Sequence, residues 1–270
     1  MYSILKMANK ETEKLEAKKK KKRQLGALEK VGAYVQLMVK TFALPDKWSM
    51  FFRQYFTEVV NLGVNSILID ILISFFIGAA MTIQMKLNMS NPLLPEYLTG
   101  YAVRECLLLE FSPTVLGLVL AGKVGSSIAS ELGTMRITEQ IDALDIMGVN
   151  SANYLIFPKI MAFVTFIPCL VIISIASGLL GGAFLAKFTD TITMHEYIYG
   201  IQFAFTPFYV TYAIIKSLVF AFIISSVASF YGYTVKGGAL EVGKSSTDAV
   251  VNSSVIILVS NIMLTNLLLQ

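Results

Sequence analysis

Three ionisable residues lie inside long apolar segments of this 270-residue chain: Asp70, Glu110 and Lys216. Two acids and an amine that met in one cavity could carry out acid–base or lipid-transfer chemistry. Ionisable groups at membrane depth face protein or a wet cavity, because exposure to hydrocarbon is costly. An intramembrane enzyme is therefore one hypothesis, and turnover by the isolated chain would distinguish it.

Each of the three residues also has a plainer interpretation. Glu110, which we expect to line a cavity, would otherwise be a helix-end charge that reaches water. Asp70 has either a local hydrogen-bonding role or a role in transport. Lys216 is either structural or directed into the cavity.

Residues 238–245, GALEVGKS, fit the nucleotide-binding expression G-x-x-x-x-G-K-[ST]. That loop normally follows a buried strand and opens a helix in an α/β domain, so that backbone amides surround the phosphates. Here it follows a membrane-length apolar run, and only 25 residues remain after Ser245. We expect a short cytoplasmic loop, with no nucleotide or other cofactor bound by this chain.

The remaining candidates for site chemistry are few. His195 is the only histidine, and one imidazole beside Glu196 makes a poor metal site, so we expect a surface residue. Cys106 and Cys169 both fall in apolar segments and are interpreted as small core residues. The sequence thus indicates neither a metal site nor a catalytic residue.

The elements that must position these residues are membrane helices. The chain is 55% hydrophobic and 15% charged, with a mean hydropathy of +0.67, so most of it must be solvated by lipid. We predict an all-α integral membrane protein. Five segments are long enough to cross a bilayer: residues 59–85, 97–120, 154–186, 207–233 and 249–269.

The distribution of basic residues predicts the orientation of these spans. With the N-terminus inside, two lysines fall in outer loops, Lys86 and Lys187, and five basic residues fall in inner loops: Lys123, Arg136, Lys159, Lys236 and Lys244. This asymmetry predicts an arrangement with the N-terminus on the cytoplasmic side and the C-terminus on the outer side.

The N-terminal part divides into two regions before the transmembrane domain of residues 58–270. Residues 1–26 form a charged cytoplasmic tail, whose basic run indicates anionic headgroups rather than nucleic acid. Residues 27–57 have amphipathic helical spacing, and their second half carries an aromatic stripe: Trp48, Phe51, Phe52, Tyr55 and Phe56. Such a face suits an interfacial helix, the alternative being a soluble helix packed on a core.

One polar stretch, residues 131–159, interrupts the apolar sequence between the second and third spans. Its first half is predicted to be helical, with Ile137, Ile141 and Leu144 on one face, and Pro158 marks entry into the next span. It is either a docking element for a soluble partner or a solvated connector. In the third span, Gly178 and Gly182 have a spacing that allows close helix packing, either within one chain or across a dimer.

The polar stretch and its flank carry a family resemblance. The run AGKVGSSIASELGTMRITEQIDALDIMGVN, residues 121–150, resembles the signature of the MlaE family of ABC-transporter permeases. Residues 61–84 look like the first membrane helix of that family, and residues 214–233 and 246–268 its last two. The chain departs from the family at Leu109, Lys123 and residues 150–151, where the family has Arg, Arg and Asp-Pro.

The resemblance implies a permease subunit that moves phospholipid as a homodimer. Its partners would be a separate ATPase that binds ATP and magnesium, an MCE-domain lipid-binding protein and, in some systems, a small STAS-type subunit. By that likeness Glu110 would line or support the lipid cavity. Asp70 and Lys216 are assigned to the cavity as ionisable groups within membrane segments; Lys216 matches a family lysine in an Ile-Lys-Ser motif, whereas the family has an apolar residue at Asp70. The coupling helix would present five residues to the ATPase: Glu131, Arg136, Thr138, Glu139 and Gln140.

Two alternatives to phospholipid transport fit the same composition. One is a permease for another hydrophobic cargo such as a sterol. The other is a passive channel or scaffold, which would show flux or assembly without nucleotide.

Overall fold

A computed structural model describes residues 26, 28–43, 48–89, 94–189 and 192–269. All regular structure in these residues is helical, which confirms the predicted all-α class. The chain divides into two compact units, Met1–Leu44 and Pro45–Gln270.

The first unit contains one helix over residues 28–41, as its apolar spacing predicts. The Thr41 hydroxyl donates a hydrogen bond of 2.9 Å to the Leu37 carbonyl. The predicted charged tail lies outside the described residues, apart from residue 26.

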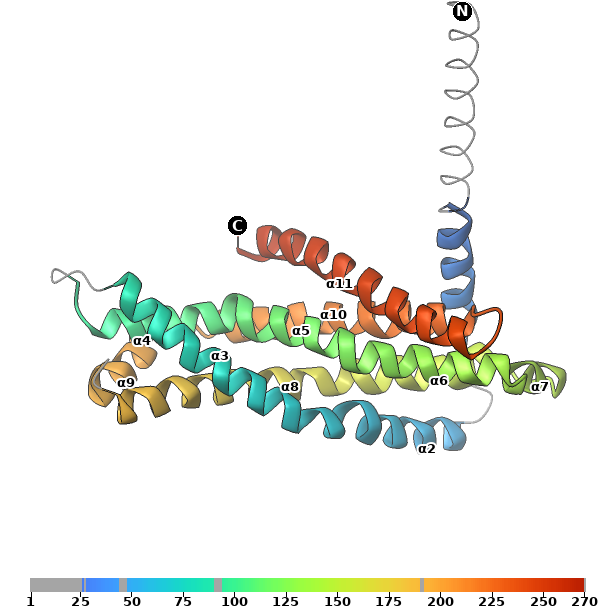
Figure 1. Ribbon diagram of the computed structural model, residues 1–270, viewed down its shortest axis with the longest axis horizontal. Helices are drawn as coiled ribbons and strands as arrows, with labels where there is room; N and C mark the ends of the chain where they lie inside the picture. Colours follow the sequence, from blue (N-terminus) through green and yellow to red (C-terminus); the bar gives the residue numbers. More distant parts are fainter. Residues whose placement is uncertain (1–25, 27, 44–47, 90–93, 190–191, 270) are drawn as a thin grey trace, which may run out of the picture. The chain divides into compact units, whose positions relative to one another are not determined.

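The second unit contains five helices long and apolar enough to cross a membrane, which confirms the predicted number (Figure 1). The first runs without a gap from Trp48 to Asn88 and the second from Tyr97 to Ile137. The other three are α8 (Ser151–Phe188), α10 (Phe208–Tyr233) and α11 (Ala239–Leu269).

The first long helix joins the predicted interfacial helix directly to the first span. It consists of α2 (Trp48–Glu58), a π-helical turn η1 (Val59–Gly63), a 3-10 turn η2 (Val64–Ser66) and α3 (Ile67–Asn88). The aromatic stripe of α2 divides: Phe51 packs on Phe157 of α8, with ring centroids 5.1 Å apart, and Trp48, Phe52 and Phe56 remain exposed. Only the exposed part of the stripe is free to meet lipid headgroups.

The second long helix alternates between α and π geometry. Its segments are α4 (Tyr97–Cys106), η3 (Leu107–Val115), α5 (Leu116–Leu120), η4 (Ala121–Gly125) and α6 (Ser126–Ile137). Pro113 lies inside the π-helical η3. A π segment frees backbone groups from regular pairing and often marks a functional site.

The α3–α8 pair packs closely along its length. A Cβ atom at Gly78 would overlap the Gly178 carbonyl oxygen, and one at Gly181 would overlap that of Phe75. A Cβ atom at Gly182 would overlap the Tyr197 hydroxyl. The glycine spacing noted in the sequence is therefore used within this chain, and it holds α3 and α8 as a rigid pair.

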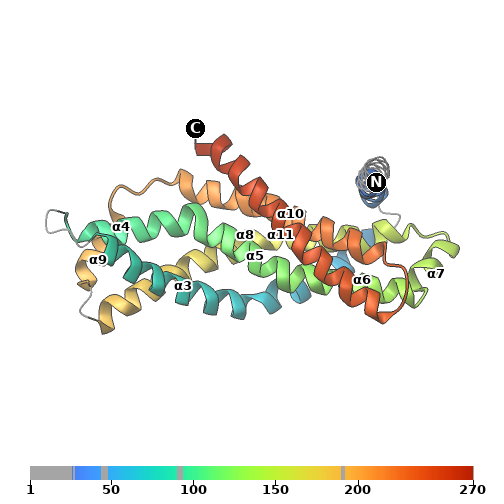
Figure 2. The same ribbon diagram turned by 45° about the horizontal axis from the view of Figure 1, so that its top comes forward.

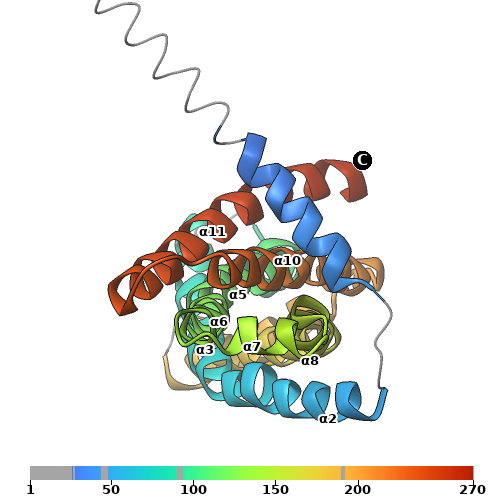
Figure 3. The same ribbon diagram turned by 90° about the vertical axis from the view of Figure 1, so that its right-hand side faces the viewer.

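Two short helices lie at opposite ends of the second unit. Helix α7 (Gln140–Ile146) connects α6 and α8 at one end, and α9 (Met194–Gln202) packs on α4 at the other (Figures 1 and 3). Tyr197 of α9 is completely buried and donates a hydrogen bond of 3.1 Å to the Leu179 carbonyl. Burial raises the pKa of Tyr197 to about 12.

Helix α11 begins ten residues before the span predicted from the sequence, at Ala239 rather than Ala249. The predicted loop at residues 238–245 is therefore wrong, because all but its first residue are helical. The Ser245 hydroxyl fixes this helical start by donating to the Tyr231 carbonyl of α10 at 2.7 Å. The later part of α11 diverges from α10 (Figure 2).

Candidate functional site

Glu110 of η3 and Lys216 of α10 form an ion pair inside the second unit. Lys216 Nζ lies 2.9 Å from Glu110 Oε1, and it also donates to the Leu109 carbonyl at 3.1 Å and to the Tyr212 hydroxyl at 2.9 Å. The Lys216 side chain is completely buried, whereas that of Glu110 is 41% exposed. Two of the three ionisable residues singled out in the sequence therefore meet.

Helix α11 completes this arrangement with two polar side chains. Asn261 Nδ2 donates to Glu110 Oε2 at 3.0 Å, and Thr265 Oγ1 donates to Oε1 at 3.1 Å. Thr114 of η3 adds a hydroxyl 3.2 Å from Oε2. Both carboxylate oxygens are thus hydrogen-bonded, and η3, α10 and α11 are joined through one group. We call these residues the Glu110 network: Glu110, Thr114, Tyr212, Lys216, Asn261 and Thr265.

Three residues of the Glu110 network, Glu110, Asn261 and Thr265, form the floor of an open hollow of about 440 Å³. Its lining mixes polar and aliphatic side chains: Glu110, Asn261, Ile262, Thr265, Asn266 and Leu269. Because Lys216 is buried behind Glu110, the hollow presents a carboxylate edge and amides rather than an ammonium group. A concave site with convergent polar groups beside apolar walls suits an amphipathic ligand.

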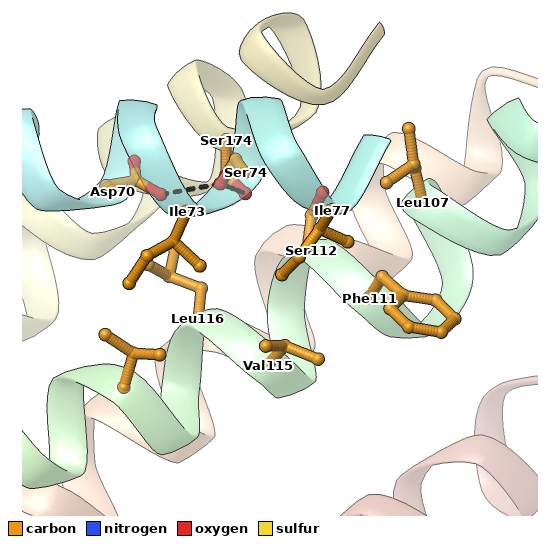
Figure 4. A pocket seen from close by; sticks show the side chains of 11 residues that line it. Asp70, Ile73, Ser74, Ile77, Leu107, Phe111, Ser112, Val115, Leu116 and Ser174 are labelled. Carbon is orange, nitrogen blue, oxygen red and sulfur yellow. Dashed lines mark hydrogen bonds between the residues drawn. The ribbon is translucent and has the colours of Figure 1, made fainter. Parts of the chain in front are cut away.

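Asp70 lies in a different pocket and does not join the Glu110 network (Figure 4). Its Oδ1 accepts a hydrogen bond of 3.1 Å from Ser74, whose hydroxyl is in turn 2.8 Å from that of Ser174 on α8. Asp70 is therefore hydrogen-bonded within its own helix and contacts neither Glu110 nor Lys216 in any described hydrogen bond or ion pair. The three-residue enzyme site considered from the sequence is not assembled.

The predicted coupling segment, residues 131–140, is not one helix. Helix α6 ends at Ile137, Glu139 has a left-handed backbone with φ of 60°, and α7 begins at Gln140. The break turns the chain sharply, so the predicted segment becomes the end of one helix and the start of another. Of the five predicted coupling residues, Thr138, Glu139 and Gln140 are exposed.

Glu131, by contrast, is engaged inside the chain. Its Oε2 lies 2.7 Å from Lys159 Nζ, which also lies 2.6 Å from Glu58 Oε1. Lys159 is 1% exposed, so a buried ammonium joins α2, α6 and α8. Helix α8 itself starts at Ser151, before Pro158, and the Asn150 side chain accepts a hydrogen bond of 3.3 Å from the Asn153 amide.

Arg136 also has a partner within the chain. Its Nη1 lies 2.6 Å from Asp142 Oδ1, and its guanidinium lies 5.9 Å from the centre of the Tyr233 ring. Arg136 therefore holds α7 against the end of α6. The exposed apolar tip of this element is formed by Ile146 and Met147, which are 87% and 68% exposed.

Several residues of these arrangements were not predicted from the sequence. Arg104 is buried and donates to the Ile201 and Phe203 carbonyls at 2.6 and 2.8 Å, which ties α4 to the C-terminal end of α9. The sequence could have identified Asn261 and Thr265 as site candidates, because polar residues four positions apart in an apolar helix lie on the same face. The pairing of Glu58 with Lys159 had no local signal, since these residues are far apart in the sequence.

Two minor predictions have mixed outcomes. His195 is exposed, as predicted for a surface residue. The assignment of the cysteines to the core is wrong for Cys169, which is exposed, and Cys106 is partly buried. An apolar helix in a membrane protein directs some small residues toward lipid, so apolar surroundings in sequence do not establish burial.

The sequence of this chain is similar to those of known membrane transport proteins. The model of the family described as "Permease MlaE" matches residues 55–267. A probable ABC transporter permease protein of Rickettsia bellii is 36% identical over 218 residues, covering 81% of this chain and 84% of the relative. A Synechocystis protein of similar description is 34% identical over 81% and 83% of the two chains. The chloroplastic protein TRIGALACTOSYLDIACYLGLYCEROL 1 of Arabidopsis thaliana is 32% identical over 83% of this chain and 64% of its own length.

Proposed function

This chain belongs to the MlaE permease family, and from that premise we propose that it moves phospholipid, or a similar lipid, between membranes as the membrane subunit of an ABC transporter. In this proposal two copies form a homodimer, a separate ATPase supplies the energy, and an MCE-domain protein exchanges lipid on the far side. ATP and magnesium are bound by the ATPase partner, and a small STAS-type subunit is an optional addition.

The observation that carries the lipid proposal is the hollow above the Glu110 network. Its polar floor and the aliphatic side chains of Ile262 and Leu269 match a molecule with a polar head and an apolar chain. The name of the Arabidopsis relative contains that of a galactolipid, which agrees with a lipid cargo. Glu110 contacts the cargo in this proposal, and Lys216 supports Glu110 from behind.

The exposed surface of α11 supports the homodimer. Its outward side chains are aliphatic over several turns, among them Val255, Val259 and Met263, each more than half exposed. Since this face continues into the hollow at Ile262, a second copy against it would close the site from one side.

The end of the second unit that carries α7 supports docking of an ATPase. The α7 tip, defined as Ile146 and Met147, projects from a helix held by the Arg136–Asp142 pair. A rigidly held apolar tip can transmit the displacement of a docked protein to α6 and α8, and so bias the hollow between two shapes. We place this end in the cytoplasm, with the N-terminus, and the C-terminus in the periplasm of an inner-membrane protein.

Transfer of lipid between vesicles tests the proposal. The chain is reconstituted with its ATPase and MCE-domain partners, and transfer of a fluorescent phospholipid and a fluorescent sterol is followed with ATP. We expect phospholipid transfer that stops when the ATPase carries a catalytic-site substitution. Sterol transfer alone would identify another cargo, and transfer that continues without ATP would identify a passive channel.

In the same vesicles, Ile146→Asp should reduce ATP-driven transfer at least tenfold, because a charge at the α7 tip opposes apolar docking. Glu139→Lys should weaken docking to a smaller extent, since Glu139 is exposed and has no ion pair among the described residues. Co-purification of the ATPase measures docking directly.

The matched control is Met194→Asp, which places the same charge on exposed α9 at the opposite end. It should leave ATPase co-purification intact. Equal ATPase retention by Ile146→Asp and wild type would count against docking at the α7 tip.

A further inference from the structure

A small pocket lies between α3, α8, η3 and α5 (Figure 4). Its volume is about 10 Å³, close to the least space that holds one water molecule. Four polar residues line it, Asp70, Ser74, Ser112 and Ser174, and the other seven lining residues are apolar. None of these polar residues belongs to the Glu110 network.

Two oxygen atoms in this pocket lack a hydrogen-bond partner. Asp70 is completely buried; its Oδ1 accepts from Ser74, but its Oδ2 has no partner. Ser112 is 3% exposed, and its Oγ has none either. A native fold rarely leaves buried polar atoms unpaired, so this pair of orphaned oxygens on one cavity points to a bound species.

The pocket offers no positive charge to an ionised carboxylate. Asp70 is its one ionisable lining residue. The charged groups on the surrounding helices are engaged elsewhere: Lys86 of α3 pairs with Glu96, Lys159 of α8 pairs with Glu58 and Glu131, and Glu110 of η3 pairs with Lys216. Lys123 of η4, one turn beyond the lining residue Val119, donates to the Asn65 carbonyl. Lys187, at the other end of α8, is exposed. An ionised carboxylate buried among apolar side chains without a cation is strongly disfavoured, so the group must be neutralised where it lies.

We propose that the Asp70 pocket binds one proton and one water molecule. The carboxyl group is held as the neutral acid, its Oδ2–H donates to the water, and the water donates to Ser112 Oγ. The proton comes from solvent, and no other bond is made or broken. This arrangement satisfies both orphaned oxygens and joins α3 to η3 without a buried charge.

The position of this site gives the proton a structural consequence. Helices α3 and α8 are fixed together at Gly78 and Gly178, whereas η3 is a π segment that contains Pro113. The same segment presents Ser112 to the Asp70 pocket and Glu110 to the hollow. The protonated pocket therefore anchors the ligand-facing segment to the rigid pair. This inference is independent of the proposed cargo.

Infrared spectroscopy of the purified full-length chain at neutral pH tests the site. A neutral carboxylic acid gives a C=O stretching band well separated from those of carboxylates and amides, and the band shifts in D₂O. We expect wild type to show this band and Asp70→Asn to lose it. Ser112→Ala should move the band to higher frequency, because the water loses one of its partners. Asp248→Asn, the same change at an exposed residue of α11, should leave the band in place.

Asp70→Asn is close in shape to the neutral acid and should keep the melting temperature in detergent within a few degrees of wild type. A wild-type spectrum without the acid band, or a band that persists in Asp70→Asn, would overturn the proposal. Sodium-dependent stabilisation that disappears in Asp70→Asn would identify a metal-cation site and overturn it as well.

Discussion

Lys216→Met is expected to abolish ATP-driven lipid transfer and to lower the melting temperature in detergent. Lys216 is completely buried and donates to Glu110, Tyr212 and the Leu109 carbonyl. Without its ammonium group, Glu110 loses its counter-charge, and the hollow is left with an uncompensated negative charge. Removing one partner of a buried ion pair costs roughly 3–5 kcal/mol, and the partial exposure of Glu110 places this case at the lower end, about 3 kcal/mol.

The double variant Lys216→Met with Glu110→Leu separates packing from function. Replacing both members of a buried pair with apolar groups is often neutral for stability. We therefore expect the double variant to recover most of the melting temperature and none of the transfer. Lys244→Met, at an exposed lysine of α11, is the matched control and should resemble wild type. Wild-type transfer by the double variant would show that the Glu110 network has no role in transport.

Lys159→Met is expected to have the largest effect on stability. The Lys159 ammonium lies 2.6 Å from Glu58 and 2.7 Å from Glu131, and both Lys159 and Glu58 are buried. Two carboxylates would lose their shared counter-ion, and Glu58 could not reach water without separating α2 from α8. We expect a loss of about 3–5 kcal/mol, measured as a lower melting temperature and a poor yield of folded protein.

Adding Glu58→Gln to Lys159→Met should restore part of that loss, because the buried carboxylate is then neutral. Lys187→Met, at the exposed far end of α8, is the control for removing a lysine from the same helix. A Lys159→Met protein as stable as wild type would mean that the three-residue contact adds nothing to the packing of α2, α6 and α8.

The membrane helices could be predicted because hydrophobic length is a direct consequence of bilayer thickness. Their ends were less accurate, since polar residues continue a helix wherever another helix satisfies them. Glu131 illustrates this: its charge indicated a cytoplasmic connector, yet Lys159 accommodates it within the extended helix α6. The helical start of α11 escaped prediction for a related reason, because the Gly238–Ser245 segment is polar and rich in glycine.

The candidate site was predictable in part. Glu110 and Lys216 were detectable as costly charges in apolar segments, and the structure brings them together. Asp70 gave the same signal but lies in a separate pocket, because sequence alone does not fix the rotation of a helix about its axis. The hydrogen bonds of Thr114 and Asn261 depend on contacts between distant segments, which the spacing along one helix cannot reveal.

Site-specific crosslinking at the α7 tip tests the central claim most directly. Met147→Cys is made in a chain whose Cys106 and Cys169 are replaced by serine, and membranes that contain the ATPase partner are treated with a short bifunctional thiol reagent. We predict a crosslink between residue 147 and the ATPase, formed from the cytoplasmic side and absent for Phe188→Cys at the opposite end of α8. Labelling of residue 147 only from the periplasm, or equal crosslinking at both positions, would contradict the account.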